Sequence, residues 1–149
     1  QQLSTRPGIP FIIFRVGPDC ASKVGQFYKE RLGAAIVRVD DVTVAVNTGA
    51  DGSLLIFTEG DVDAKAVEKQ RGMHLCIYIS QFETSFARVT PWTNPKFRTL
   101  DRCDTLEEAI GSRQFRFKDF TDGDFELEHE TRALTHSSFM KPLIYLSSY

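Results

Sequence analysis

The sequence predicts an α+β fold built from two copies of a β-α-β-β-β unit. Two observations predict it. The order of strand, helix and strand near the start of the chain is repeated after residue 72, and turn residues separate short strand-like runs throughout the sequence. A chain of 149 residues has room for one domain made of two such half-sized units. We therefore place the first unit at residues 9–60 and the second at 72–132, between a flexible polar lead-in (1–8) and an apolar C-terminal tail (133–149).

The first unit opens with an apolar-rich strand at Pro10–Val16. A helix follows, in which helical spacing relates the apolar residues Val24, Phe27, Tyr28 and Leu32. Asp19 is expected to cap the start of this helix, and Gly33 is expected to end it. The helix leads to three strand-like runs at Ala35–Val39, Val42–Asn47 and Leu54–Thr58.

The second unit begins with a strand at Met73–Ile79. Ser80 and Glu83 have the spacing of a capping box, and Phe82, Phe86 and Val89 then form one apolar face of a helix. The remaining predicted elements are a weak strand at Lys96–Leu100, a short helix at Asp104–Gly111 and a hairpin that turns at Asp122-Gly123.

Apolar and acidic residues alternate in the second strand of this hairpin. The face opposite Phe125 and Leu127 therefore carries three carboxylates, those of Glu126, Glu128 and Glu130. A two-residue turn would pair Phe115 with Glu130 and Phe117 with Glu128, and so place both rings on the carboxylate face. This face either lines an enclosed space or is a solvated outer surface balanced by Arg113, Arg116 and Arg132.

Composition excludes several classes of protein. The net charge is −2 with acids and bases interspersed, which argues against a nucleic-acid partner. No apolar run reaches the roughly 20 residues of a membrane span. The three cysteines lack metal-ligand spacing and predict an intracellular protein, either cytoplasmic or in an organelle after removal of a targeting segment. Twelve phenylalanines indicate aromatic packing or an aromatic-lined cavity.

Three stretches of the chain resemble the glyoxalase fold of the vicinal oxygen chelate superfamily. They are Phe11–Gly17 with the helix ending Phe27-Tyr28-Lys-Glu-Arg-Leu-Gly33, then Gly72–Ile79, then Asp122–Glu128. The resemblance covers roughly residues 9 to 132. It implies a curved eight-stranded cup with helices outside and a ligand inside. It also implies a homodimer, and a divalent metal held by up to four side chains from strands one, four, five and eight.

By this resemblance the metal site is incomplete. Phe11 and Ile56 occupy the ligand positions of strands one and four, so only His74 and Glu126 remain. Catalytic metal sites use about three protein ligands, and a third would require Glu128 or Glu59 to reach in through a different strand register. We therefore expect no cofactor, with one divalent ion on His74 and Glu126 as the alternative.

The same resemblance, with the strand parity, indicates which side chains face the interior of the cup. The catalytic candidates are His74 and Glu126. The candidate ligand contacts are mostly apolar or aromatic and comprise Phe11, Ile13, Arg15, Ile56, Tyr78, Phe115, Phe117 and Glu128. Such a lining suits a small, partly apolar organic molecule.

Three functions agree with these observations. The favoured hypothesis is a metal-free glyoxalase-like protein that binds a small organic ligand in its cup. The first alternative is a metal-dependent lyase, isomerase or dioxygenase of the same superfamily. The second is a structural subunit of a larger assembly, anchored through its apolar tail at residues 139–149.

Overall fold

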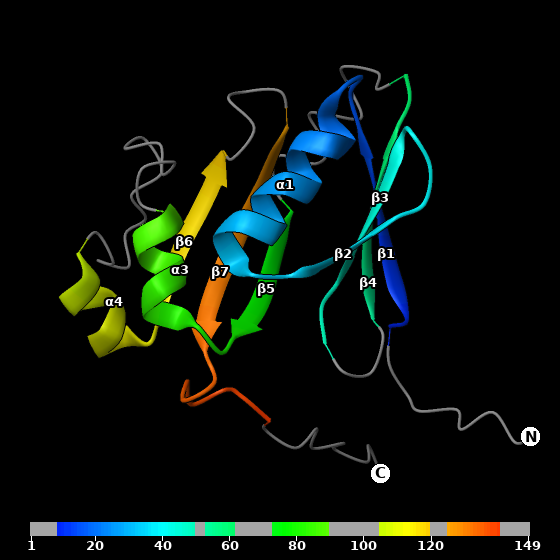
Figure 1. The fold of residues 1–149 in the computed structure, drawn as a ribbon. Coiled ribbons are helices and arrows are strands. Elements are labelled where there is room, and N and C mark those ends of the chain that lie inside the picture. Colours follow the sequence, from blue (N-terminus) through cyan, green and yellow to red (C-terminus); the bar gives the residue numbers. More distant parts are fainter. Residues whose placement is uncertain (1–8, 50–52, 62–72, 90–104, 120–124, 141–149) are drawn as a thin grey trace, which may run out of the picture.

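The computed structural model of the chain describes residues 9–49, 53–61, 73–89, 105–119 and 125–140 (Figure 1). The predicted strand at Lys96–Leu100 and the predicted turn at Asp122-Gly123 lie outside these residues. Among the helices that the structure describes, none has the length and apolar character needed to cross a bilayer.

The first unit has the predicted β-α-β-β-β order. Its elements are β1 (Phe11–Val16), α1 (Cys20–Leu32), β2 (Ala35–Arg38), β3 (Thr43–Asn47) and β4 (Leu54–Glu59). The four strands form one sheet in the order β1-β4-β3-β2. β1 and β4 run parallel, which is possible because α1 and the β2–β3 hairpin supply the long connection between them.

The described part of the second unit repeats this arrangement. Its elements are β5 (His74–Ile79), α3 (Phe82–Val89), α4 (Leu106–Ser112), β6 (Gln114–Asp119) and β7 (Glu126–Ala133). The sheet order is β5-β7-β6, and β5 runs parallel to β7 as β1 does to β4. In each unit the first strand thus pairs with the last, and the predicted α+β class is confirmed.

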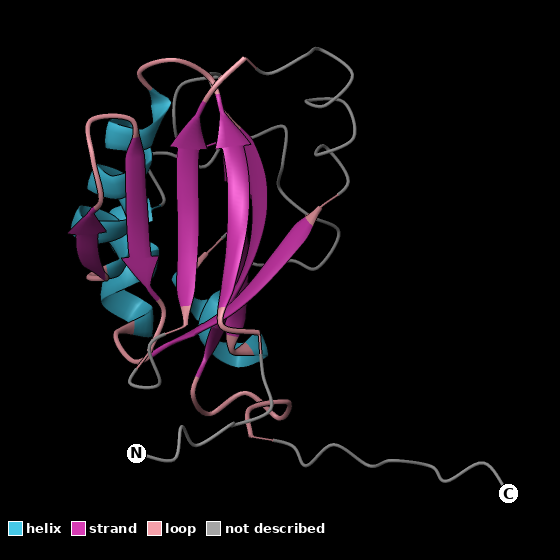
Figure 2. Ribbon diagram, turned by 90° about the vertical axis from the view of Figure 1, so that its right-hand side faces the viewer, coloured by secondary structure: helices cyan, strands magenta, loops and turns pink. Residues whose placement is uncertain are grey.

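The described helices all lie on one face of the sheets, and no described helix covers the other, which we call the open face (Figure 2). Figure 1 shows α1 lying across the junction of the two sheets. Its Tyr28 ring lies 5.6 Å from Phe57 of β4, and its Phe27 ring lies 5.2 Å from Phe117 of β6. Seven phenylalanines therefore belong to a shared core on the helix side, where their burial is the main stabilising contribution; they are Phe14, Phe27, Phe57, Phe82, Phe115, Phe117 and Phe125.

The start of α1 is stabilised by a residue that the sequence did not indicate. Asp19 occupies the N-cap position with a left-handed backbone (φ 60°) and makes no side-chain cap hydrogen bond, so the predicted cap is wrong. Instead, the Ala21 N–H donates to Oε1 of Glu59 at 3.0 Å. The negative charge also lies near the positive end of the helix dipole. Gly33 ends the helix with φ 69°, as predicted.

The register between β6 and β7 differs from the prediction. Asp119 pairs with Glu126, as a two-residue turn requires, but a bulge then shifts the pairing by one residue, and Phe117 lies opposite His129. A one-residue shift moves all later side chains to the opposite face. Phe115 and Phe117 are therefore 1% exposed in the core and not on the carboxylate face.

Candidate functional site

The open face of the first sheet is largely apolar. In the parallel pair β1–β4, Phe11 lies opposite Leu54, Ile13 opposite Ile56 and Arg15 opposite Thr58. The intervening residues, Phe14 and Val16, are buried under α1, which fixes the orientation of the row. Phe11 and Ile13 remain 51% and 52% exposed. The predicted ligand contacts Phe11, Ile13, Arg15 and Ile56 thus share one face, as expected from their spacing.

The guanidinium of Arg15 differs from the other cations on the open face. Within the described parts of the chain, it forms neither a hydrogen bond nor an ion pair. It lies one pleat from Ile13 on an exposed surface. Arg15 is therefore available to an external anion or hydrogen-bond acceptor.

The open face of the second sheet carries charges that are paired with one another. We call this set the ion-pair ladder; its members are Arg116, Lys118, Glu126, Glu128, Glu130 and Arg132. Lys118 Nζ lies 3.1 Å from Glu126 Oε2. Arg116 bridges Glu128 (3.3 Å) and Glu130 (3.5 Å). The three carboxylates therefore share one face of β7, as the alternation of apolar and acidic residues predicted. Arg116 and Arg132 balance their charge, as expected if this face is an outer surface.

Glu130 and Arg132 form the tightest contact of the ladder. Arg132 Nη2 donates to Glu130 Oε1 at 2.7 Å, and its Nη1 donates to the Tyr78 hydroxyl at 3.1 Å. Burial alone would raise the pKa of Glu130, but the hydrogen bond and charge of Arg132, with those of Arg116, lower it overall. The hydrogen bond to Tyr78 is the main factor that raises the pKa of Arg132. Both groups are fixed in their charged forms.

Arg113, the third cation of the outer-surface interpretation, lies away from the ladder. It ends α4 with a left-handed backbone (φ 59°), and its side chain donates to the Thr135 carbonyl at 2.8 Å. Tyr78 also contacts the start of the apolar tail, since its ring lies 5.1 Å from that of Phe139. The described beginning of the tail therefore packs on its own second sheet.

His74 and Glu126, the two ligand candidates that the resemblance implied, each have a different charged neighbour. The residue opposite His74 is Glu128, and the His74 Nδ1 to Glu128 Oε1 distance is 3.6 Å. Glu126 is instead paired with Lys118. No cluster of three or more potential ligands (His, Cys, Asp or Glu) occurs within the described ranges.

The donor set of this face therefore does not fit a divalent metal. Phe11 and Ile56, which stand at two of the implied ligand positions, offer no donor atom. Glu59, considered as an additional ligand, lies on the helix side of β4 and accepts the hydrogen bond from Ala21. A third ligand for a catalytic site is thus lacking among these residues.

A buried tyrosine–histidine pair joins the two units, and sequence reasoning missed it. The Tyr28 hydroxyl of α1 lies 2.5 Å from Nε2 of His129 in β7, while the His129 Nδ1 lies 2.7 Å from the Leu127 carbonyl. A carbonyl can only accept, so Nδ1 carries the proton and Nε2 accepts from Tyr28. His129 also stacks on Phe117 at 4.3 Å. The sequence did contain one indication: His129 alternates with Leu127 and Thr131 along β7, and so lies on the face of the strand that carries the apolar residues.

Burial controls the protonation of this pair. It lowers the pKa of His129 to about 3, an effect that the hydrogen bond to Leu127 only partly opposes. It also raises the pKa of Tyr28 well above the usual range. Both groups are therefore neutral at physiological pH. Because both side chains are almost completely buried, we assign their hydrogen bond to the stability of the fold.

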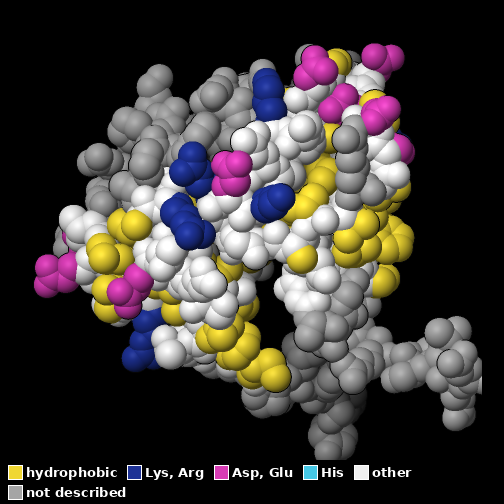
Figure 3. All heavy atoms as spheres, in the orientation of Figure 1, with side chains coloured by type: hydrophobic (Ala, Val, Ile, Leu, Met, Phe, Trp, Pro, Cys, Tyr) yellow, Lys and Arg dark blue, Asp and Glu magenta, His cyan; other side chains and the backbone are white. Residues whose placement is uncertain are grey.

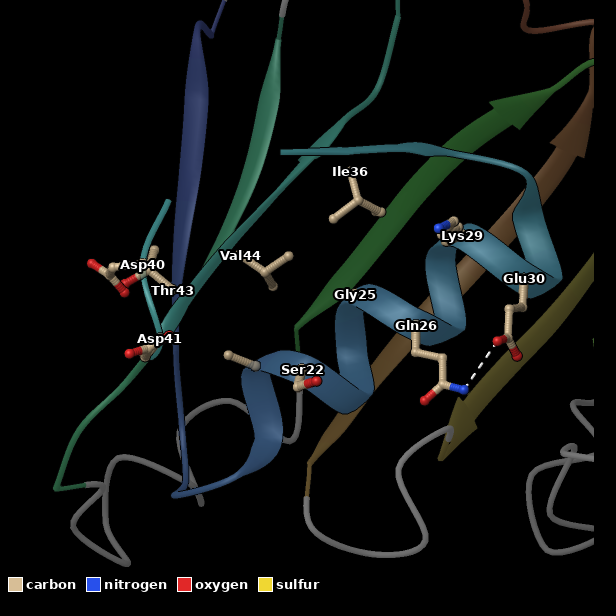
Figure 4. A pocket seen from close by; sticks show the side chains of 11 residues that line it. Ser22, Gly25, Gln26, Lys29, Glu30, Ile36, Asp40, Asp41, Thr43 and Val44 are labelled. Atoms are coloured by element: carbon tan, nitrogen blue, oxygen red, sulfur yellow. Dashed lines mark hydrogen bonds between the residues drawn. The ribbon is translucent and has the colours of Figure 1, made fainter. Parts of the chain in front are cut away.

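The helix side carries a charged groove between α1 and the β2–β3 hairpin (Figure 4). Its volume is about 450 Å³. Gly25 brings α1 close to the sheet here, since a Cβ at this position would lie 2.9 Å from Val44 Cγ2. The polar residues that line it are Ser22, Gln26, Lys29, Glu30, Asp40, Asp41 and Thr43. The sequence did not indicate this groove, because it depends on how closely the helix approaches the hairpin.

Comparison with known proteins identifies the fold. No protein-family model matches the sequence, and no curated protein matches it. Solved structures do match. A gene product of Arabidopsis thaliana has a TM-score of 0.53 and 14% identity, over 80% of this chain and 93% of that chain. A protein from Bacillus anthracis described as a glyoxalase-family protein has a TM-score of 0.52 and 10% identity, over 84% and 94% of the chains.

The fosfomycin resistance protein FosX of Mesorhizobium loti is a third similar structure, with a TM-score of 0.50 and 14% identity over 84% of this chain and 91% of that chain. At identities of 10–14%, these similarities show the fold and nothing further. The chain therefore has a fold similar to that of a glyoxalase-family protein, in agreement with the fold that the three sequence stretches implied.

Proposed function

We propose that this glyoxalase-fold chain is a metal-independent protein that binds a small, partly apolar organic molecule on the open face of its sheets. One observation carries the proposal: an exposed apolar row, Phe11 and Ile13, adjoins an exposed guanidinium, Arg15, that has no partner among the described residues. Exposed apolar surface next to a specific polar group is typical of a ligand site.

The chemistry of the open face limits the ligand. The cations of the ion-pair ladder already have carboxylate partners, whereas Arg15 has none in the described chain. An acceptor group on the ligand, such as a carboxylate, would gain a charge-assisted hydrogen bond from Arg15. An apolar or aromatic body would then cover Ile13 and Phe11. The ligand is therefore a small organic acid with an apolar body.

Metal independence is supported by the donor set. Glu126 is paired with Lys118, and Glu128, which lies opposite His74, is paired with Arg116, so a metal that recruits these carboxylates would have to displace existing ion pairs. The apolar residues Phe11 and Ile56 would contribute no ligand in return. Displacing paired charges for a two-ligand site is energetically unfavourable.

Two measurements test the proposal. Elemental analysis of protein purified without chelator is expected to find no stoichiometric divalent ion, and added Zn²⁺ or Mn²⁺ is expected to leave the melting temperature unchanged. One equivalent of metal that is lost in His74→Ala would refute metal independence.

For the ligand, thermal shift is measured with benzoate, phenylacetate and 4-phenylbutyrate, each compared with its neutral amide. Saturation at about 100 times Kd raises stability by about 2.7 kcal/mol. The acids are expected to stabilise the wild type, and Arg15→Ala is expected to abolish the effect. Arg88→Ala, which removes an exposed guanidinium from α3, is the matched control. Equal responses in Arg15→Ala and the wild type would refute the assignment of Arg15.

A further inference from the structure

A second hollow lies at the seam between the two units, next to the C-terminal end of α1. Its volume is about 410 Å³. The first unit contributes Leu32, Val46 and Leu55 to its wall, and the second unit contributes Ile77 and Ile79 at the end of β5. Figure 3 shows a recess below the centre of the view, between the two halves of the molecule. We call this hollow the seam cavity.

The lining of the seam cavity contains no charged side chain among its 14 described residues. Charged residues make up 26% of the sequence, so a random sample of this size would contain about four. The groove of Figure 4, of similar volume, is lined by Lys29, Glu30, Asp40 and Asp41. The lining therefore offers a charged ligand no ion-pair partner among the described residues, which favours an uncharged ligand.

Hydrogen bonds orient two of the polar side chains that line the seam cavity, Asn47 and Thr48. Oδ1 of Asn47 accepts a hydrogen bond from the Gly49 N–H at 3.0 Å, which directs the amide and leaves Nδ2 as a donor. The Thr48 hydroxyl donates to the Ser53 carbonyl at 2.9 Å. A ligand carbonyl or ether oxygen at this end would accept from Asn47, while the apolar wall residues would contact the rest of the molecule.

From this geometry we propose that the seam cavity binds an uncharged, largely apolar organic molecule with one hydrogen-bond acceptor. A volume of about 410 Å³ is in the range of pockets that bind small organic ligands. This site is separate from the one proposed on the open face, because Phe11, Ile13 and Arg15 are not among its lining residues. The inference does not rest on the function proposed above.

A ligand in the seam cavity would contact both units at once. Tyr28 is part of the wall, and its hydroxyl bonds to His129 of β7. Binding would therefore stabilise the packing of the first unit on the second, and the melting temperature would rise with ligand concentration.

The test uses prodan, an uncharged fluorescent naphthalene with a ketone acceptor, in equilibrium titrations that follow its emission. Ala35→Trp places an indole at the edge of the cavity and is expected to weaken prodan binding by about tenfold or more. Ala87→Trp, the same substitution at an exposed position of α3, is expected to bind as the wild type does. Asn47→Ala is expected to weaken prodan binding, and circular dichroism confirms that each variant is folded.

A second measurement needs no variant. In ¹H–¹⁵N spectra of the wild-type protein, prodan is expected to shift the amides of Gly49, Ile79 and Ser80. Two results would place prodan on the open face and overturn the proposal. One is chemical-shift changes confined to residues of β1. The other is that Ile13→Glu abolishes prodan binding while Ala35→Trp binds as the wild type does. Absence of prodan binding to the wild type would also overturn it. The benzoate experiment is unaffected by either result, so failure of the two sites can be distinguished.

Discussion

Acidification is expected to destabilise the fold through His129, whose imidazole is fully buried between Tyr28 and Phe117. The folded protein holds this side chain neutral, with a pKa of about 3 against 6.5 for the free residue. Between these two values the unfolded chain binds a proton that the folded chain does not. Stability therefore rises with pH across this window: the contribution is fully present above about pH 6.5 and is lost as the pH falls towards 3.

The magnitude follows from the two pKa values. Each pH unit within the window corresponds to about 1.4 kcal/mol. Moving from about pH 7 to about pH 5 is thus expected to lower the free energy of unfolding by about 2 kcal/mol. Such a loss is a large fraction of the 5–15 kcal/mol that typical domains possess. Glu130 does not titrate in this interval, because its pKa is lowered below the usual carboxyl value.

The assay is urea unfolding at a series of pH values, compared between variants. In the double variant Tyr28→Phe/His129→Phe both side-chain partners are removed together, so neither leaves the other unsatisfied, and no buried imidazole titrates. The Leu127 carbonyl loses its bond from Nδ1, a cost that does not depend on pH in this range. Its stability is expected to be nearly flat between about pH 5 and 7. His74→Gln, which removes an exposed imidazole outside the core, is the matched histidine control.

The single variant Tyr28→Phe separates the hydrogen bond from the titration. It leaves Nε2 of His129 as a buried acceptor without its donor, and is expected to cost about 1–3 kcal/mol at neutral pH. It should still show a strong pH dependence. If the wild type and the double variant lost the same stability between about pH 7 and 5, the argument for a buried neutral imidazole would be wrong.

Three further predictions concern other contacts. Gly25→Ala is expected to lower the free energy of unfolding, measured by thermal unfolding, by about 1–3 kcal/mol, because the new Cβ would lie 2.9 Å from Val44 Cγ2. If Gly25→Ala costs as much in a Val44→Ala background as in the wild type, that contact is not the cause. Glu59→Gln is expected to lower stability by about 1 kcal/mol through a weaker cap on Ala21, and an unchanged melting temperature would contradict this. Below about pH 4.5, protonation of Glu130 is expected to lower stability further, and Glu130→Gln should remove that part of the slope in acid titration.

The sequence predicted most of the elements because their signals are local. Helical spacing at Val24, Phe27 and Tyr28 is a property of neighbouring residues, and these side chains are buried as expected. The alternation in β7 likewise assigned Leu127 to the core and Glu128 to the open face. Successive side chains of a strand point to opposite faces because of the backbone geometry alone, so the predicted facing is correct wherever the strand is regular.

The failures occur where a position depends on a distant part of the chain. The bulge between β6 and β7 is one irregular step, and it moved Phe115 and Phe117 from the predicted open face into the core. Asp19 had the correct residue type for a cap, but Glu59, 38 residues from Ala21 in the chain, accepts the hydrogen bond.

By itself, then, the sequence determined the repeated β-α-β-β-β order, the resemblance to the glyoxalase fold, and the side of each regular strand that faces the helices. Tertiary structure decided which charges pair, and so left Arg15 without a partner in the described chain while Glu126 received Lys118. It also created the Tyr28–His129 bond and the seam cavity, which require two units to meet. Local patterns specify which face of an element is apolar, but the contacts between elements depend on register and packing that no single segment encodes.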